Sequence, residues 1–275
     1  MVSNKRLYIY LLLLVIVVVT MIMLRHVINN RSVITVPHDY QEIMEHGEMK
    51  VVTDYNSIGY FVSGDTIEGF QYEMIQALEK EWGITINLFL ENSLDDNLSG
   101  LQSGKYDLVA RNIPINSELI DNFSFTQHLN FNKLILVQRK AEFNDSLEPI
   151  RQHLDLAKKT IYVAKDSPSK LRLKNLSNEI GDTIFLIENS VYEAEQLVMM
   201  VASGDIDFTV CDEDVAVRLA QKLPEIDIET DISFTQIESW AVRRESPQLL
   251  DSLDSWLSQF KETADYKGII TKYYK

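Results

Sequence analysis

Two stretches of the sequence, one hundred residues apart, share a Ser-Gly-x-x-Asp motif that joins a helical pattern to a strand pattern. They are Ser103–Asp107 and Ser203–Asp207. A glycine just after a helical pattern commonly adopts the left-handed conformation that ends a helix. An apolar strand pattern follows each glycine, over 106–110 and 208–211. The repetition predicts two half-domains of similar design.

Strand and helix patterns alternate through both halves of the chain. In the helical pattern over 70–82, Phe70, Met74 and Leu78 share one face with Trp82. The other expected elements are strands at 49–53, 84–90, 161–164 and 183–187, and helices at 94–102, through 194–201, after 212 and at 248–260, with Pro168 and Pro247 at the first positions of helices.

Strands separated by helices imply largely parallel sheets, and such sheets bind ligands beyond the carboxyl ends of their strands. We therefore predict an α/β, two-lobed fold with two chain crossings, near Gln138–Arg139 and Asp231–Ser233. The first lobe is expected to comprise about 41–137 and 234–275, and the second about 138–233. Two crossings form a hinge that can close on a ligand.

The segment Leu7–Leu24 contains 18 residues without a charge, Gly or Pro. As a helix it nearly spans the hydrocarbon core of a bilayer. We predict a single transmembrane anchor at 7–24, after a cytoplasmic tail at 1–6 and before a linker at 25–40. A cleaved signal peptide is the alternative, although no small-x-small cleavage pattern follows. Lys5 and Arg6 favour a cytoplasmic N-terminus, which places the folded part outside the inner membrane.

Acidic residues dominate the folded part. The first 31 residues have four basic and no acidic side chains, so the remainder carries 22 basic against 41 acidic residues, a net charge of −19. Nucleic acid is therefore excluded as a partner. The single cysteine, Cys211, cannot form an internal disulfide and lies in an apolar run typical of a buried side chain.

Three segments carry a resemblance to a known family: Gly69–Met74, Leu101–Ala110 and Gly204–Asp212. From about residue 48 to its end, the chain resembles the bacterial family 3 extracellular solute-binding proteins. The segment Asn116–Phe123 is similar to the binding-protein-like domain that precedes the catalytic domain in membrane-bound lytic transglycosylases F. The resemblance implies a periplasmic-binding-protein fold of type 2 that closes on a small polar ligand, amino-acid-like or a cell-wall fragment. It also implies a partner, either an ABC permease or a cell-wall hydrolase.

The chain departs from this family where amino-acid binders hold the ligand carboxylate. The resemblance places Leu119 at the arginine that makes this contact and Pro114 at its hydroxyl partner. Leucine cannot replace a bidentate arginine–carboxylate pair. We take Arg111 and its neighbour Asn112, at the end of the strand over 106–110, as candidate substitutes; a solvated strand-end arginine is the alternative.

The resemblance places Asp212 where the family's acid meets a ligand amino group. A helix cap by Asp212 or Asp214 explains the same residues equally well.

Four further residues are candidates for the ligand site. Ser167 and Ser169 lie at a helix start, where free N–H groups suit an anionic group, although helix capping alone explains Ser167. Tyr55 and Tyr60 follow the first strand and are expected to form a lid over the ligand.

Signatures of enzymes are missing from the sequence. The five histidines are scattered without metal-ligand spacing, and no nucleophile elbow or phosphate loop occurs. The sequence ends where the transglycosylases' binding domain ends, so we expect no catalytic domain, no metal and no cofactor. Two alternatives stay open: a ligand-less module that regulates a cell-wall enzyme or transporter, and an enzyme resembling a lytic transglycosylase or dehydratase.

Overall fold

The computed structural model divides into two units, Met1–Pro37 and His38–Lys275. It describes residues 10, 12–14, 16–17, 19–21, 39–165 and 167–274. The described residues of the first unit are helical. Across the described part of the chain, no helix is long and apolar enough to cross a membrane. The predicted tail, half of the predicted anchor and most of the predicted linker lie outside the described residues.

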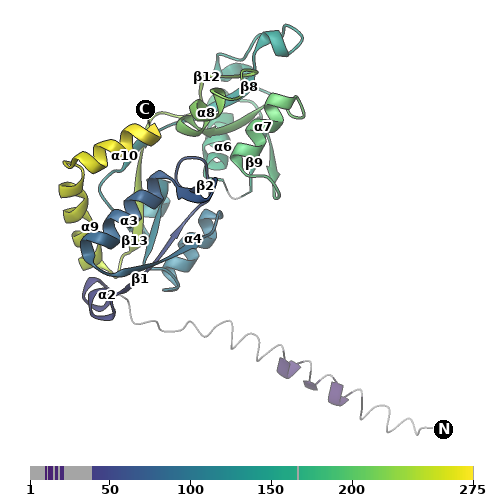
Figure 1. Cartoon of the computed structure of the whole chain (residues 1–275). Coiled ribbons are helices and arrows are strands. Elements are labelled where there is room, and N and C mark those ends of the chain that lie inside the picture. The colour runs from purple at the N-terminus through teal and green to yellow at the C-terminus, as the bar shows by residue number, and fades with distance from the viewer. Residues whose placement is uncertain are drawn as a thin grey trace. The chain divides into compact units, whose positions relative to one another are not determined.

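Two sheets organise the second unit (Figure 1). The strand order of the first is β4-β1-β5-β13-β6, with β7 also on β13, and that of the second is β10-β9-β11-β8-β12. The first sheet contains β1 (Glu48–Thr53), β4 (Thr85–Leu90), β5 (Leu108–Pro114), β6 (Phe123–Phe125), β7 (Asn130–Asn132) and β13 (Gln236–Arg243). The second contains β8 (Leu134–Arg139), β9 (Thr160–Ala164), β10 (Phe185–Asn189), β11 (Thr209–Asp212) and β12 (Ile226–Asp231).

The predicted α/β, two-lobed architecture is confirmed. Parallel pairs form one side of each sheet, β4-β1-β5 in the first and β10-β9-β11 in the second. Antiparallel strands complete them: β13 joins the first sheet through β5, and β8 joins the second through β11. Those two antiparallel strands come from the segments next to the chain crossings.

The first chain crossing lies earlier than the sequence predicted. Leu134–Arg139 pairs with β11 and β12, so it belongs to the second lobe and the chain crosses at Lys133, not at Gln138–Arg139. The apolar pattern of this segment fits either lobe, and only its strand partners, β11 and β12, show that it belongs to the second. The second crossing runs between Asp231 and Gln236, in the predicted segment.

Helices cover both sheets. Their bounds are α2 (Tyr40–His46), α3 (Phe70–Trp82), α4 (Leu94–Gln102), α5 (Ser117–Ile120), α6 (Ser169–Ile180), α7 (Ala194–Ser203), α8 (Glu213–Ala220), α9 (Pro247–Phe260) and α10 (Ala264–Tyr274), with short 3-10 turns at Ala141–Phe143 and His153–Leu156. Helix α2 includes Tyr40, so the folded part begins slightly before the predicted end of the linker. Pro247 opens α9 as expected, but Pro168 is the N-cap of α6 and not its first residue.

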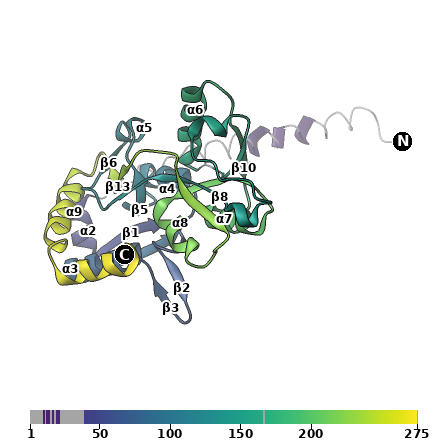
Figure 2. The ribbon, with the colours of Figure 1, turned by 90° about the horizontal axis from the view of Figure 1, so that it is seen from above.

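A hairpin of β2 (Phe61–Ser63) and β3 (Thr66–Glu68) was not predicted and projects from the first lobe (Figure 2). It is joined to α3 through Gly69, where φ is 139°. A Cβ atom at Gly69 would lie 2.2 Å from the carbonyl oxygen of Gly59. Glycine is therefore required where these two backbone segments meet.

Each lobe has its own apolar core. In the first lobe, Trp240 of β13 is fully buried and stacks on Trp256 of α9 at 6.2 Å between ring centroids. In the second, Leu197 and Val201 of α7 pack with Cys211, which is buried as predicted. Val215 of α8 packs against both the first core and part of the second.

An arginine stabilises each copy of the Ser-Gly-x-x-Asp motif. In the first lobe, Arg243 of β13 donates to the carbonyls of Leu101 and Tyr106 and pairs with Asp107 at 3.1 Å. Asp107 also accepts a hydrogen bond from the N–H of Lys50 at 2.9 Å. The helix end is thereby tied to two strands of the first sheet.

In the second lobe, Arg139 of β8 takes the equivalent place. It donates to the carbonyls of Val201 and Ile206, both at 3.1 Å, and pairs with Asp207 at 3.0 Å. Asn144 accepts two further hydrogen bonds from it. The repeated aspartates therefore hold an arginine from the antiparallel strand next to each crossing, and do not face the ligand cleft.

Candidate functional site

A cleft of about 410 Å³ lies between the lobes, with walls from both. Its side chains stand at or beyond the carboxyl ends of the parallel strands: Asp54 after β1, Asn92 after β4, Lys165 after β9 and Asp212 at the end of β11. This is where an open parallel sheet places a ligand.

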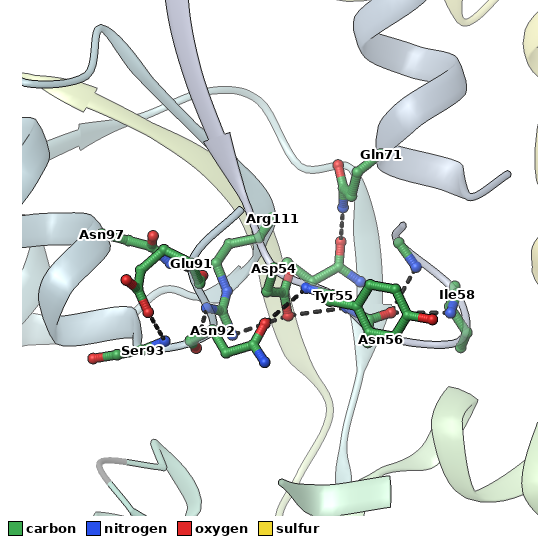
Figure 3. Close-up of polar contacts among 12 residues, drawn as sticks. Asp54, Tyr55, Asn56, Ile58, Gln71, Glu91, Asn92, Ser93, Asn97 and Arg111 are labelled. Atoms are coloured by element: carbon green, nitrogen blue, oxygen red, sulfur yellow. Dashed lines mark hydrogen bonds and ion pairs between the residues drawn. The ribbon is translucent and has the colours of Figure 1, made fainter. Parts of the chain in front are cut away.

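Arg111 of β5 lies in this cleft but is already engaged. Its guanidinium pairs with the Asp54 carboxylate at 3.1 Å and donates to the carbonyl of Asn92 at 2.9 Å (Figure 3). Both side chains of the pair are 15% exposed. The guanidinium charge is therefore balanced from within the first lobe, and the residue is not the solvated arginine of the alternative interpretation.

Asn112 belongs to a chain of hydrogen bonds that runs from the core to the cleft. The indole N–H of Trp240 donates to Gln71 at 2.7 Å, and Gln71 donates to Asn112 at 2.7 Å. Asn112 in turn donates to the hydroxyl of Tyr274 at 3.1 Å. Gln71, Asn112 and Tyr274 all line the cleft, so this chain fixes the orientation of three polar side chains in its wall.

Asp212 lies opposite Arg111 on the second lobe. It occupies the N-cap position of α8, yet its side chain makes no capping hydrogen bond. Within the described residues its carboxylate has no hydrogen-bond or ion-pair partner. Burial, together with the neighbouring Asp214, raises the pKa of Asp212 to about 6, and Arg111 acts in the opposite direction. Helix capping therefore does not account for this side chain.

A second group of carboxyls lies next to Asp212, where the lobes meet. Asn130 of β7 donates to Asp214 at 2.7 Å and to Glu238 of β13 at 3.2 Å. Glu238 is 2% exposed, and burial together with Asp212 and Asp214 raises its pKa to about 9. Glu238 is thus protonated at neutral pH, whereas Asp212, with a pKa of about 6, is ionised.

Ser167 and Ser169 line the cleft at the start of α6. Their hydroxyls lie 2.8 Å apart, and the Ser167 hydroxyl accepts a hydrogen bond from the N–H of Ser169 at 3.3 Å. Capping of the helix thus occupies part of their hydrogen-bonding capacity.

The structure separates the two predicted tyrosines. Tyr55 lines the cleft and is 51% exposed. Tyr60 is buried and packs edge-on against Tyr72, with ring centroids 5.6 Å apart, and it is not among the residues that line the cleft. The structure therefore does not place Tyr60 in the wall of the cleft, where a lid residue was predicted.

The positions that hold a carboxylate in the family's amino-acid binders are apolar here. Leu119 packs against the core beneath β5 and does not line the cleft, whereas Pro114 does. Two described arginines line the cleft, and each already has an acidic partner: Arg111 binds Asp54, and Arg172 binds Glu179. Neither offers an unpaired charge in place of the arginine that is missing at position 119.

Sequence reasoning missed two acids at the start of α7. Glu193 and Glu195 line the cleft, and Glu195 accepts a hydrogen bond from the N–H of Ser57 at 2.7 Å, which joins the two lobes. Burial raises the pKa of Glu193. Five carboxylates and three basic side chains line the cleft, so its charge is negative. Among the described residues, no group of His, Cys, Asp or Glu could hold a metal ion.

Solved structures share this fold. An ancestral arginine-binding protein bound to arginine matches with a TM-score of 0.73 and 22% identity, covering 83% of this chain and 99% of that one. The solute receptor for L-cysteine of Neisseria gonorrhoeae matches with a TM-score of 0.75 and 17% identity, covering 86% and 94%. The model of the bacterial extracellular solute-binding proteins, family 3, matches residues 48–275. The chain belongs to this family.

The chain also has distant relatives among longer proteins. The membrane-bound lytic murein transglycosylase F of Desulfosudis oleivorans is 26% identical over 234 residues, which cover 85% of this chain and 50% of that protein. The chain spans about half the length of the curated relatives it matches.

Proposed function

We propose that the protein is a membrane-anchored, extracytoplasmic receptor that closes its two lobes on a small polar solute and has no enzymatic activity of its own. One observation carries the proposal: the Asp212 carboxylate faces an interlobe cleft and has no partner among the described residues. Asp212 is half-buried, so its carboxylate loses part of its hydration without gaining a partner, and a ligand that pairs with it recovers that cost.

Leu7–Leu24 supplies the proposed anchor, with residues 1–6 in the cytoplasm and the solute-binding domain in the periplasm or outside the cell. A receptor held at the membrane can pass its solute to an ABC permease or signal to a membrane partner.

The proposed solute differs from a standard α-amino acid. Leu119 lies where a carboxylate-binding arginine is expected, and the Arg111 guanidinium already pairs with Asp54. The negative charge of the cleft favours a ligand with a cationic group.

Isothermal titration of residues 38–275 with a panel of amines, amino acids, short peptides and muropeptides tests the proposal. We expect at least one solute to bind, Asp212→Asn to abolish its binding, and Asp251→Asn to leave it unchanged, because Asp251 is exposed on α9 outside the cleft. Binding that survives Asp212→Asn, or a panel without a single ligand, contradicts the proposal. Release of soluble products from murein sacculi would contradict the absence of enzymatic activity.

A second candidate function is regulation of a cell-wall hydrolase without a ligand. The distant similarity to lytic transglycosylase F proteins and the internally paired Arg111 favour it. Under this alternative the solute panel gives no ligand, and residues 38–275 bind to and change the rate of a murein hydrolase whether residue 212 is Asp or Asn.

A further inference from the structure

A second groove of about 310 Å³ adjoins the cleft. The first lobe contributes the segment that leads into the β2–β3 hairpin and the hairpin's first strand, and the second lobe contributes α7, α8 and Lys222, two residues after the end of α8. Tyr55 and Glu195 line both the groove and the cleft, which makes the two spaces neighbours. The groove is lined by Tyr55, Ser57, Phe61, Val62, Ser63, Glu195, Arg218 and Lys222.

The charge of the groove is opposite to that of the cleft. Arg218 and Lys222 face one carboxylate, Glu195, which already accepts a hydrogen bond from Ser57. The Arg218 guanidinium lies over the ring of Phe61 at 5.0 Å, and neither basic side chain forms a hydrogen bond or ion pair with a described residue. The nearby Glu68 carboxylate forms its ion pair with Lys272 at 2.9 Å, and the charge of Arg218 contributes only the last of the influences that lower the pKa of Glu68. Two cations are thus available to an anion at the edge of an acidic cleft.

Helix α8 sets the separation between the two kinds of charge. Asp212 is its N-cap and Arg218 lies six residues further along. At 1.5 Å of rise per residue, the two positions are about 9 Å apart along the helix. An α-amino acid carries its amino and carboxylate groups on one carbon atom, whereas Asp212 and Arg218 line two different, adjoining spaces.

We propose, on the basis of the receptor function above, that this groove is an extension of the ligand site, in which Arg218 and Lys222 bind the anionic end of an elongated zwitterion. The cationic end pairs with Asp212, and the chain between them passes Tyr55 and Glu195. A guanidinium forms two parallel hydrogen bonds with a carboxylate, and Phe61 holds that guanidinium in place. The carboxylate contact that is absent at Leu119 is thereby supplied from the second lobe, six residues after Asp212.

Because the groove has walls from both lobes, the anionic end also favours closure. The hairpin side chains come from the first lobe and the two cations from the second. A ligand held at Asp212 and Arg218 therefore spans the interlobe contact between Ser57 and Glu195.

A series of ω-amino acids from 3 to 9 carbons serves as a molecular ruler in isothermal titration of residues 38–275. We expect the affinity to depend on chain length and to peak within the series, at the members long enough to reach both Asp212 and Arg218. Replacing the carboxylate of the best member by a carboxamide should weaken binding about 10- to 100-fold. Arg218→Gln should cause a similar loss for the carboxylate and little change for the carboxamide.

Two further variants complete the test. Lys222→Gln, at an exposed position, should weaken carboxylate binding without affecting the fold, and Lys174→Gln, an exposed lysine of α6, should have no effect. Affinity that does not depend on chain length, or equal losses for carboxylate and carboxamide in Arg218→Gln, overturns the inference. Failure of the whole series to bind also overturns it, whereas the receptor function itself stands if the solute panel yields a ligand that depends on Asp212.

Discussion

Asp107 and Asp207 occupy matching positions in the two lobes, yet their replacement by alanine should have very different effects on stability. Asp107 is 2% exposed and its partner Arg243 is 6% exposed. Asp107→Ala leaves the Arg243 charge buried beside two carbonyls and also removes the acceptor of the Lys50 N–H. Breaking a buried pair by removing one partner costs about 3–5 kcal/mol.

The Arg139–Asp207 pair of the second lobe serves as the control. The Asp207 side chain is 73% exposed, and Arg139 keeps Asn144 and two carbonyls as partners when Asp207 is replaced. An exposed ion pair contributes about 0–1 kcal/mol. Asp207→Ala should therefore be nearly neutral.

Urea unfolding of residues 38–275, with thermal melts alongside, measures the difference. For a domain of this size, about 3–5 kcal/mol corresponds to a fall in Tm of roughly 6–20 °C, against no more than about 4 °C for Asp207→Ala. Raising the salt concentration should not narrow the gap, because a buried pair is screened little. Equal losses in the two variants would refute the reasoning that burial, and not the shared motif, sets the cost.

Three further predictions concern pH and backbone conformation. Glu238, with an ordinary pKa of 4.5 and a folded pKa of about 9, takes up a proton on folding, so the stability it contributes is present below pH 4.5 and lost as the pH rises through 9. Between pH 5 and 9, the free energy of unfolding should therefore change less with pH in Glu238→Gln than in the parent protein. The same pH dependence in both proteins would contradict this. A cationic ligand pairs with the ionised form of Asp212, whose pKa is about 6. Isothermal titration should therefore give a Kd that rises about tenfold per pH unit below pH 6 and is constant above it. A Kd independent of pH would argue against the pairing. Gly69→Ala should lower the free energy of unfolding in urea by more than Gly47→Ala, for which a loss of about 1–2 kcal/mol is expected. A Cβ at Gly69 would meet the Gly59 carbonyl, whereas one at Gly47 would meet nothing within 4 Å. A larger loss for Gly47→Ala would refute the close approach at Gly69.

Local sequence signals were sufficient for most elements of the fold. The apolar face of 70–82 predicted α3 with its observed bounds, and the helix predicted at 94–102 is α4 with its observed bounds. The β2–β3 hairpin was missed although its turn, Gly64–Asp65, is a known hairpin signal, because its strands have three residues each and show little alternation.

Contacts between distant segments could not be predicted from local patterns. The Tyr274 hydroxyl reaches Asn112, 162 residues away, and α10 itself was not predicted. The contact between Glu195 and Ser57 exists because two lobes come together, and nothing near either residue indicates it. Asp212 was placed correctly at its strand end, but that its side chain does not cap α8 emerges from the structure alone.

Small-angle X-ray scattering of residues 38–275, with and without a saturating solute from the binding panel, tests most directly whether the two lobes close on a ligand. We expect the radius of gyration to fall when the solute binds to the parent protein and to stay unchanged in Asp212→Asn. A solute that saturates the cleft in titration but leaves the scattering curve of the parent protein unaltered would contradict it.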